Sequence, residues 1–234
     1  MTKESKYDTI RTMKKRDVLL QLAPFFTAIV LGVVTMLVYA FAFEGSRGTI
    51  YAEIAIGMAL PLALPVIGWI TKKPFPVTLS ALVCSHVFFA IDLGAAMGFN
   101  GRIAWWDLFL HGAFGLLCAV FLSFFLIRWK GTGTSRFGQL FFIAFATLGF
   151  AGLWEIFEYL CDLMFHNDPQ GVWSAVANGE NPMTDTMTDM LITLAGVALY
   201  YLALWIDQLT GYRFMRKFYR AACGEENLQS ESKL

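Results

Sequence analysis

The sequence predicts an all-α, polytopic membrane protein: one bundle of six transmembrane helices with both termini in the cytoplasm. Its 234 residues are 57% hydrophobic and 15% charged, whereas soluble domains are roughly 45–50% apolar and about 25% charged. Six stretches are long and apolar enough to cross a bilayer, and the basic residues are concentrated in alternate loops. These observations exclude a soluble globular domain and a disordered chain, and they leave little room for a nucleic-acid partner.

The expected transmembrane domain covers residues 18–209. Its six spans are expected at about 18–43, 50–70, 75–99, 103–128, 137–163 and 184–209. All six should be helices, because an open strand in lipid leaves backbone groups unpaired. Pro61 and Pro65 should kink the second span, since each removes a backbone donor. The first span is far longer than the roughly 7–15 apolar residues of a signal peptide, so we expect it to be retained.

Two polar tails flank this domain. Residues 1–17 form a basic N-terminal tail, and residues 210–234 form a C-terminal tail. Within the second tail, Tyr212 to Cys223 alternates bulky apolar and basic residues with the period of a helix. This pattern predicts a short basic helix at the interface with anionic lipids. The four cysteines suggest no disulfide framework.

The distribution of basic residues predicts the orientation in the membrane. All of the 18 Lys and Arg residues except Arg47 and Arg102 lie in the two tails, the 2–3 loop or the 4–5 loop. Cytoplasmic segments carry such an excess of basic residues. We therefore expect a multi-pass protein of the bacterial inner membrane, with both termini in the cytoplasm.

Acidic residues gather near the opposite, outer surface. They form three short patches, which are Asp107 with His111 on the fourth span, Glu155 with Glu158 and Asp162 on the fifth, and Asp185 with Asp189 on the sixth. Spacings of three, four or seven residues put the members of each patch on one helix face. Because the fourth and sixth spans run inward and the fifth runs outward, the three patches should meet at one depth.

Such a cluster needs a compensating charge, because a carboxylate at the bilayer centre costs roughly 2.5–3.5 kcal/mol and only somewhat less near the interface. Carboxylates and imidazole on facing helices are the ligands of metal sites in bundle cores. We therefore predict a divalent metal ion, of unspecified identity, held by His111, Glu155, Glu158 and Asp189. Asp107 and Glu158 are the candidate catalytic groups. Supporting roles are expected for Asp92, Asp162 and Asp185.

Two structural interpretations of the same acids stay open. Acids at the start of a span also interact favourably with the helix dipole, which suits Asp107, Asp185 and Asp189. Alternatively, the three patches form a polar network that only packs the helices together.

Three strings carry a family resemblance: Trp106-Asp107-Leu108-Phe109-Leu110-His111-Gly112, then Trp154-Glu155-Ile156-Phe157-Glu158-Tyr159, then Asp185-Thr186-Met187-Thr188-Asp189-Met190 with Gly196. Over about residues 100–200 they resemble the uncharacterised bacterial inner-membrane family that includes YjdF. This resemblance implies a fold and a site but no reaction. More distantly, the order of acidic helices is similar to that of VanZ-like proteins, which are linked to glycopeptide resistance. Here the 5–6 loop lacks the Arg of that pattern, and Thr193 stands near the expected Asn.

Three functions remain open on the sequence alone. The first is a membrane-embedded hydrolase or transferase that acts on a lipid-like envelope substrate through the bound metal. The second is a proton- or cation-coupled transporter, although we see no repeated halves and expect no polar trail beyond His86 toward the cytoplasmic side. The third is a non-enzymatic envelope partner protein. Membrane lipids are the expected surroundings, and the sequence predicts no oligomeric state.

Overall fold

The computed structural model describes residues 15–42, 48–71, 75–129, 133–165 and 168–223. These residues form helices and no strands. Six helical segments among them are long and apolar enough to cross a membrane, which confirms the predicted number. The predicted tail residues 1–14 and 224–234 lie outside the described part of the chain.

The six spans are built from nine helical elements. They are α1 (Lys15–Ala42), α2 (Gly48–Ala59) continuing through η1 (Leu60–Leu62) into α3 (Ala63–Ile70), α4 (Val77–Val87) continuing into η2 (Phe88–Ala96), α6 (Trp106–Arg128), α7 (Arg136–Phe165) and α9 (Thr184–Leu209). Three short helices lie outside the spans, namely α5 (Phe99–Arg102), α8 (Val172–Asn178) and α10 (Arg213–Cys223).

The second and third spans depart from regular α-helix. In the second, Pro61 lies within a single 3₁₀ turn that separates α2 from α3. The prolines were expected to disturb this span, and the disturbance is this change from α-helix to 3₁₀-helix. In the third, the chain widens into a π-helix over Phe88–Ala96. Sequence periodicity gave no sign of this π-segment, which is much longer than the usual single-turn π-bulge.

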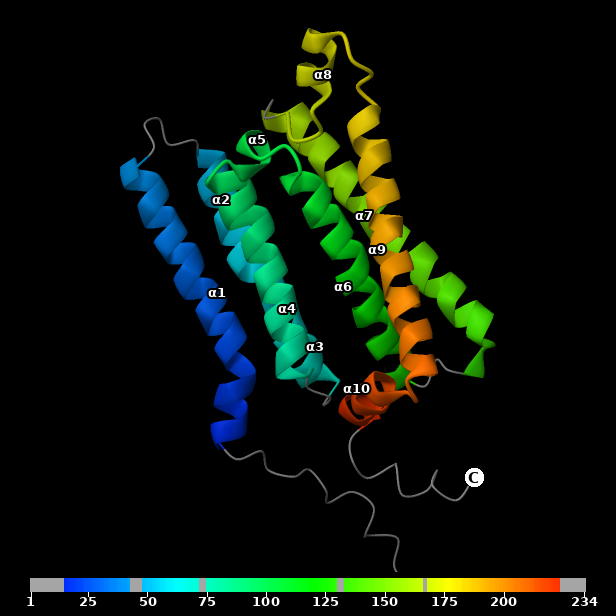
Figure 1. Cartoon of the computed structure of the whole chain (residues 1–234). Helices are drawn as coiled ribbons and strands as arrows, with labels where there is room; N and C mark the ends of the chain where they lie inside the picture. The colour runs from blue at the N-terminus through cyan, green and yellow to red at the C-terminus, as the bar shows by residue number, and fades with distance from the viewer. Residues whose placement is uncertain (1–14, 43–47, 72–74, 130–132, 166–167, 224–234) are drawn as a thin grey trace, which may run out of the picture.

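The spans pack as two groups of three (Figure 1). The elements of the first three spans, α1 to η2, contact one another, and so do α6, α7 and α9. The groups join mainly where α4 and η2 lie against α6. The second group holds the acidic patches predicted from the sequence, so its packing decides the geometry of any site.

Glycines set the distance between α6 and α9. A Cβ atom on Gly115 would collide with the carbonyl of Thr193, and one on Gly196 would collide with the carbonyl of Gly112. Small residues allow two membrane helices to approach until their backbones touch. The two helices are therefore held together at one crossing point.

The helix α10 lies across one end of the bundle (Figure 1). Both carboxylate oxygens of Asp207, near the end of α9, accept hydrogen bonds from the first turn of α10, from the N–H of Phe214 at 2.7 Å and of Met215 at 3.0 Å. The Phe218 ring meets Phe124 of α6 edge-on at 5.7 Å between centroids. Asp207 thus caps α10. The apolar face of α10 packs against the hydrophobic core.

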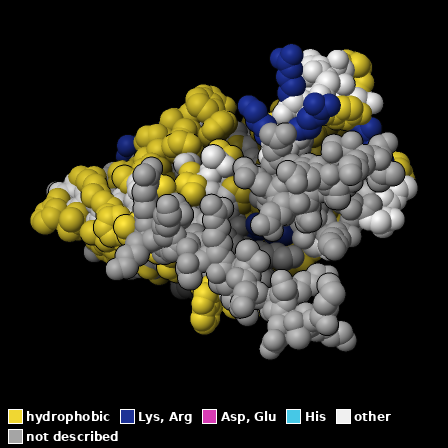
Figure 2. Space-filling view, turned by 90° about the horizontal axis from the view of Figure 1, so that it is seen from below, with side chains coloured by type: hydrophobic (Ala, Val, Ile, Leu, Met, Phe, Trp, Pro, Cys, Tyr) yellow, Lys and Arg dark blue, Asp and Glu magenta, His cyan; other side chains and the backbone are white. Residues whose placement is uncertain are grey.

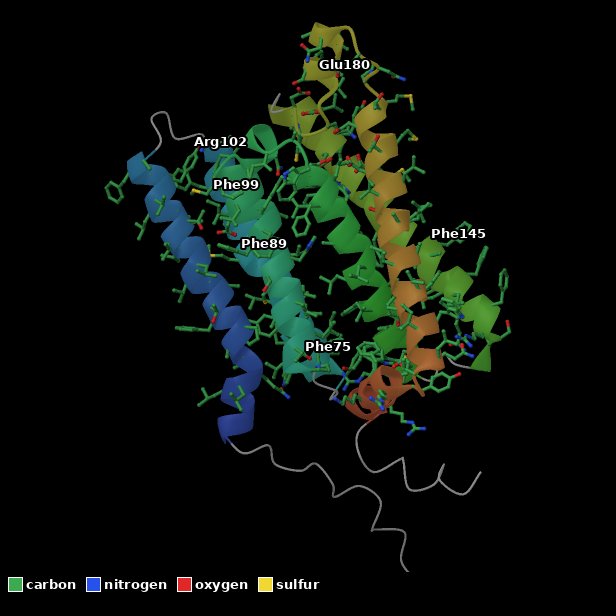
Figure 3. The ribbon with its side chains drawn as sticks, viewed as in Figure 1. Phe75, Phe89, Phe99, Arg102, Phe145 and Glu180 are labelled. Atoms are coloured by element: carbon green, nitrogen blue, oxygen red, sulfur yellow. The ribbon has the colours of Figure 1, made fainter. Side chains whose placement is uncertain are left out.

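The start of α1 and the end of α9 lie at this same end of the bundle, as six crossings require (Figure 1). Seen from this end, the described side chains in view include Lys and Arg but no Asp or Glu (Figure 2). Glu180 and Arg102 lie at the opposite end (Figure 3). Which end faces the cytoplasm stays a prediction.

Candidate metal centre

Three side chains from α6 and α9 converge near the acidic end of the bundle. Asp107, His111 and Asp189 each offer one ligand atom, and these atoms lie within 4.8 Å of one another. The Nε2 atom of His111 is 3.8 Å from Oδ1 of Asp107 and 3.8 Å from Oδ2 of Asp189. These distances are too long for hydrogen bonds. Two ligands that bind one zinc ion at about 2.0–2.2 Å are at most about 4.4 Å apart, so an ion fits between His111 and each carboxylate.

The crossing of α6 and α9 positions these groups. Asp107 and His111 are one turn apart near the start of α6, and Gly112 follows directly. On α9, Asp189 comes one turn before Thr193, whose backbone touches Gly115. The hydroxyl of Thr193 donates to the carbonyl of His111 at 3.4 Å. The contact between Gly115 and Thr193 therefore lies about one turn from His111 and Asp189 and about two turns from Asp107.

Burial makes this group more than an exposed acidic patch. Asp189 is 1% exposed and His111 is 7% exposed. Oδ1 of Asp189 has no hydrogen-bond partner among the described residues. An unpaired buried charge is strongly unfavourable, so this carboxylate requires either a proton or a cation. Asp107 is more exposed, with 38% of its side chain accessible, and it leaves the group open on one side.

Glu155 of α7 borders the same group. It is buried, and neither of its carboxylate oxygens has a partner at hydrogen-bond geometry among the described residues, although Thr186 and Gln170 lie close by. Its charge interacts with those of Asp107 and Asp189. A second buried carboxylate thus borders the three converging ligand atoms, and it has no ion-pairing partner among the described residues.

Glu158 lies on the same face of α7. Its Oε1 accepts a hydrogen bond from the indole of Trp154 at 2.8 Å, and its charge interacts with those of Glu155 and Asp189. Of the predicted metal ligands, His111 and Asp189 therefore fall within the compact group. Glu155 and Glu158 lie at its border, and Asp107 takes a place beside the imidazole.

Comparison with known families adds a decisive observation. Residues 25–208 match the family described as "Predicted membrane protein (DUF2238)". The chain belongs to this family. The family that includes YjdF is the same one, so the resemblance seen in the sequence is confirmed, whereas the VanZ-like resemblance stays a prediction. No curated protein and no solved structure matches the chain.

The three supporting residues expected in this DUF2238 protein have different surroundings. Asp185 interacts electrostatically with Asp107 and extends the acidic group along α9. Asp162 is buried and lines a cavity of about 80 Å³ beside Val172 and Trp173 of the α8 segment. Asp92 is buried within the π-helix and interacts with Thr35 of α1. It is not among the converging ligands found in the described residues.

The segment after α7 covers one side of Glu155. The side-chain amide of Gln170 donates to the backbone carbonyl of Glu155 at 3.0 Å. Asp168 accepts hydrogen bonds from the N–H groups of Trp173 and Ser174, both at 2.8 Å, and from the Ser174 hydroxyl. Partial burial alone would raise the pKa of Asp168, but these hydrogen bonds outweigh it and the pKa lies below its usual value.

Sequence reasoning missed the residues that build the site without being charged. Gly112, Gly115 and Thr193 decide how closely α6 and α9 approach, and Gln170 fixes the covering segment. The available signal was the spacing of small residues on the two helices, three residues apart on α6 and again between Thr193 and Gly196 on α9. Hydropathy treats these positions like any other apolar stretch.

Proposed function

We propose that this protein is a membrane-embedded, metal-dependent hydrolase or transferase acting on a lipid-like substrate. A divalent ion would be held by Asp107, His111 and Asp189. The observation that carries this proposal is the convergence of their three ligand atoms within 4.8 Å, in surroundings where Asp189 is 1% exposed. Imidazole with two carboxylates suits zinc, iron or manganese.

The donor set fits a catalytic site better than a structural one. Three protein ligands leave a coordination position open, as in catalytic zinc sites, and Asp107 is accessible. A metal ion there would supply Lewis-acid polarisation of a substrate and activation of a bound water. Glu155, with both carboxylate oxygens buried and unpaired in the described structure, is the candidate general base. Glu158, oriented by Trp154, supports it.

Surroundings of the site favour an amphiphilic substrate. Trp105 and Phe109 flank Asp107 in the chain and are 59% and 44% exposed. Both would face lipid in a bilayer, so a substrate could approach sideways through the membrane. Because carboxylates dominate the site, a phosphate-bearing substrate would need the positive charge of the metal.

The first test is metal content, measured by mass spectrometry on the purified full-length protein. We expect near-stoichiometric metal in the wild type and its loss in Asp189→Asn. The matched control is Asp185→Asn, one turn earlier on α9 and outside the group of three. Metal retained by Asp189→Asn, or absent from the wild type, would contradict the site.

Catalysis is tested separately with a radiolabelled lipid extract. We expect a product that disappears when the metal is chelated. Glu155→Gln should lower the rate by about 10²–10⁴-fold while keeping the metal. Full activity in metal-free protein would rule out the proposed chemistry.

One observation favours a second candidate function, proton-coupled transport. Against the sequence expectation, buried polar groups continue beyond the acidic cluster: Asp189, Thr193, Tyr200 and Asp207 are all buried on α9 at spacings of four, seven and seven residues. Such spacing puts them on one helix face. If this face conducts protons, proteoliposomes should show a proton flux that Tyr200→Phe abolishes. Tight vesicles without flux under any gradient would exclude it.

A further inference from the structure

A second cavity, of about 630 Å³, lies beside α6, next to the face that makes the glycine contact. It is bounded by α4 and η2, by α6 and by α9, with Phe214 of α10 among its lining residues. Its volume falls within the range of small-molecule sites, roughly 300–1,000 Å³. The elements α4 with η2, α6 and α9 form three of the candidate membrane spans, and the cavity lies between them.

Most of the side chains that line the cavity are apolar, as a site for a hydrocarbon chain requires. Its lining follows one stripe of α6, from Phe109 through Ala113 to Val120. The part of the lining nearest α10 runs along α9 from Tyr200 to its C-cap Thr210. At about 1.5 Å per residue it is about 15 Å long, roughly half of the 30 Å hydrocarbon thickness. Some lining residues are themselves exposed, such as Leu82 at 54% and Leu116 at 39%, so the cavity is open at its side. We call it the groove.

Basic side chains of α10 lie near one end of the groove, where Asp207, whose carboxylate accepts hydrogen bonds from the first turn of α10, also lines it. Phe214 lines the groove near the start of α10. At 100° per residue, Lys217 and Arg213 lie about 60° and about 100° from Phe214, on the side away from Met215. Both basic side chains are exposed. Seen from this end, Lys and Arg are the charged side chains in view among the described residues (Figure 2).

We infer that this groove binds one hydrocarbon chain of an anionic phospholipid, whose phosphate lies at Arg213 and Lys217. The apolar stripe explains the chain, and charge complementarity at α10 explains the anionic headgroup. This site is independent of the metal centre, since no lining residue belongs to the group of Asp107, His111 and Asp189.

The proposed binding of a hydrocarbon chain is tested by filling the groove with a larger side chain. Binding of phosphatidylglycerol to the purified full-length protein is followed by native mass spectrometry. Ala203 lines the groove, so Ala203→Phe should weaken lipid binding about tenfold or more. The control is Ala198→Phe, five residues earlier on α9, where the side chain is exposed outside the groove; it should leave lipid binding unchanged. Equal binding by both variants overturns the inference.

The headgroup is tested by charge. Phosphatidylglycerol should bind more tightly than phosphatidylcholine with the same chains. Lys217→Gln should reduce this preference about fivefold, the effect of one basic residue at an anionic surface. Arg216→Gln, whose side chain faces away from Phe214, should leave it unchanged. Equal binding of both lipids by the wild type, as an unspecific detergent-like site would give, overturns the inference. Metal content measured on the same samples separates this outcome from any failure of the metal site.

Discussion

Single carboxylates distinguish this bundle from an ordinary set of apolar helices. The spacing of Asp107 and His111 predicted a shared face, and both belong to the converging group. Spacing along one helix cannot say which neighbour comes nearest, so it did not separate Asp189, inside the group, from Glu155 at its border. Asp92 shows the same limit. A supporting role beside the acidic patches was expected for it, but it lies in a π-helix and interacts with Thr35 of α1.

Asp168 offers a prediction at the residue scale. Since its pKa is lower in the folded protein than its ordinary value of about 3.9, its hydrogen bonds stabilise the α8 segment above that pH. The stabilisation is lost as the pH falls through the lowered pKa. We expect the amides of Trp173 and Ser174 to lose hydrogen-exchange protection in this acidic range. Asp168→Asn should remove the pH dependence, and an unchanged profile in that variant would refute the assignment.

At the scale of elements, hydropathy predicted the number of spans because each span must satisfy its backbone bonds within one long apolar helix. The pairing of α6 with α9 was beyond such reasoning. Lipid-facing and helix-facing positions are both apolar, so periodicity carries little information about contacts in a bilayer. The decisive feature is backbone contact at Gly115 and Gly196, which no hydrophobic pattern indicates.

The crossing can be tested with a single methyl group. In Gly196→Ala, the new Cβ would collide with the Gly112 carbonyl and force α6 and α9 apart. We expect a loss of about 1–3 kcal/mol in stability, the usual range for overpacking, together with a lower metal content although no ligand is changed. Thermal unfolding in detergent and metal analysis measure both. Gly149→Ala, on α7 with open space around its Cβ position, is the control. Equal metal in both variants would show that the crossing does not position the ligands.

The whole molecule is polarised. Acidic residues occupy the first turns of α6 and α9, toward the end that carries Glu180 (Figure 3). Lys and Arg are the charged side chains in view among the described residues at the other end (Figure 2). This separation follows from the sequence, in which basic residues occupy the tails and alternate loops and acidic residues occupy the opposite ends of three spans, which is why it could be predicted. An acidic site at one surface and a lipid groove reaching the other also divide the two proposed activities between the leaflets.

Orientation decides which leaflet each site serves. The excess of basic residues predicts that α10 faces the cytoplasm and α8 the outside. In a variant with its native cysteines replaced by alanine, we expect Ala177→Cys, exposed on α8, to react with a membrane-impermeant maleimide in intact cells. Arg216→Cys, exposed on α10, should react only after the cells are disrupted. The reverse labelling would keep the fold but move the metal centre to the cytoplasmic leaflet, where an outer-envelope substrate could not reach it.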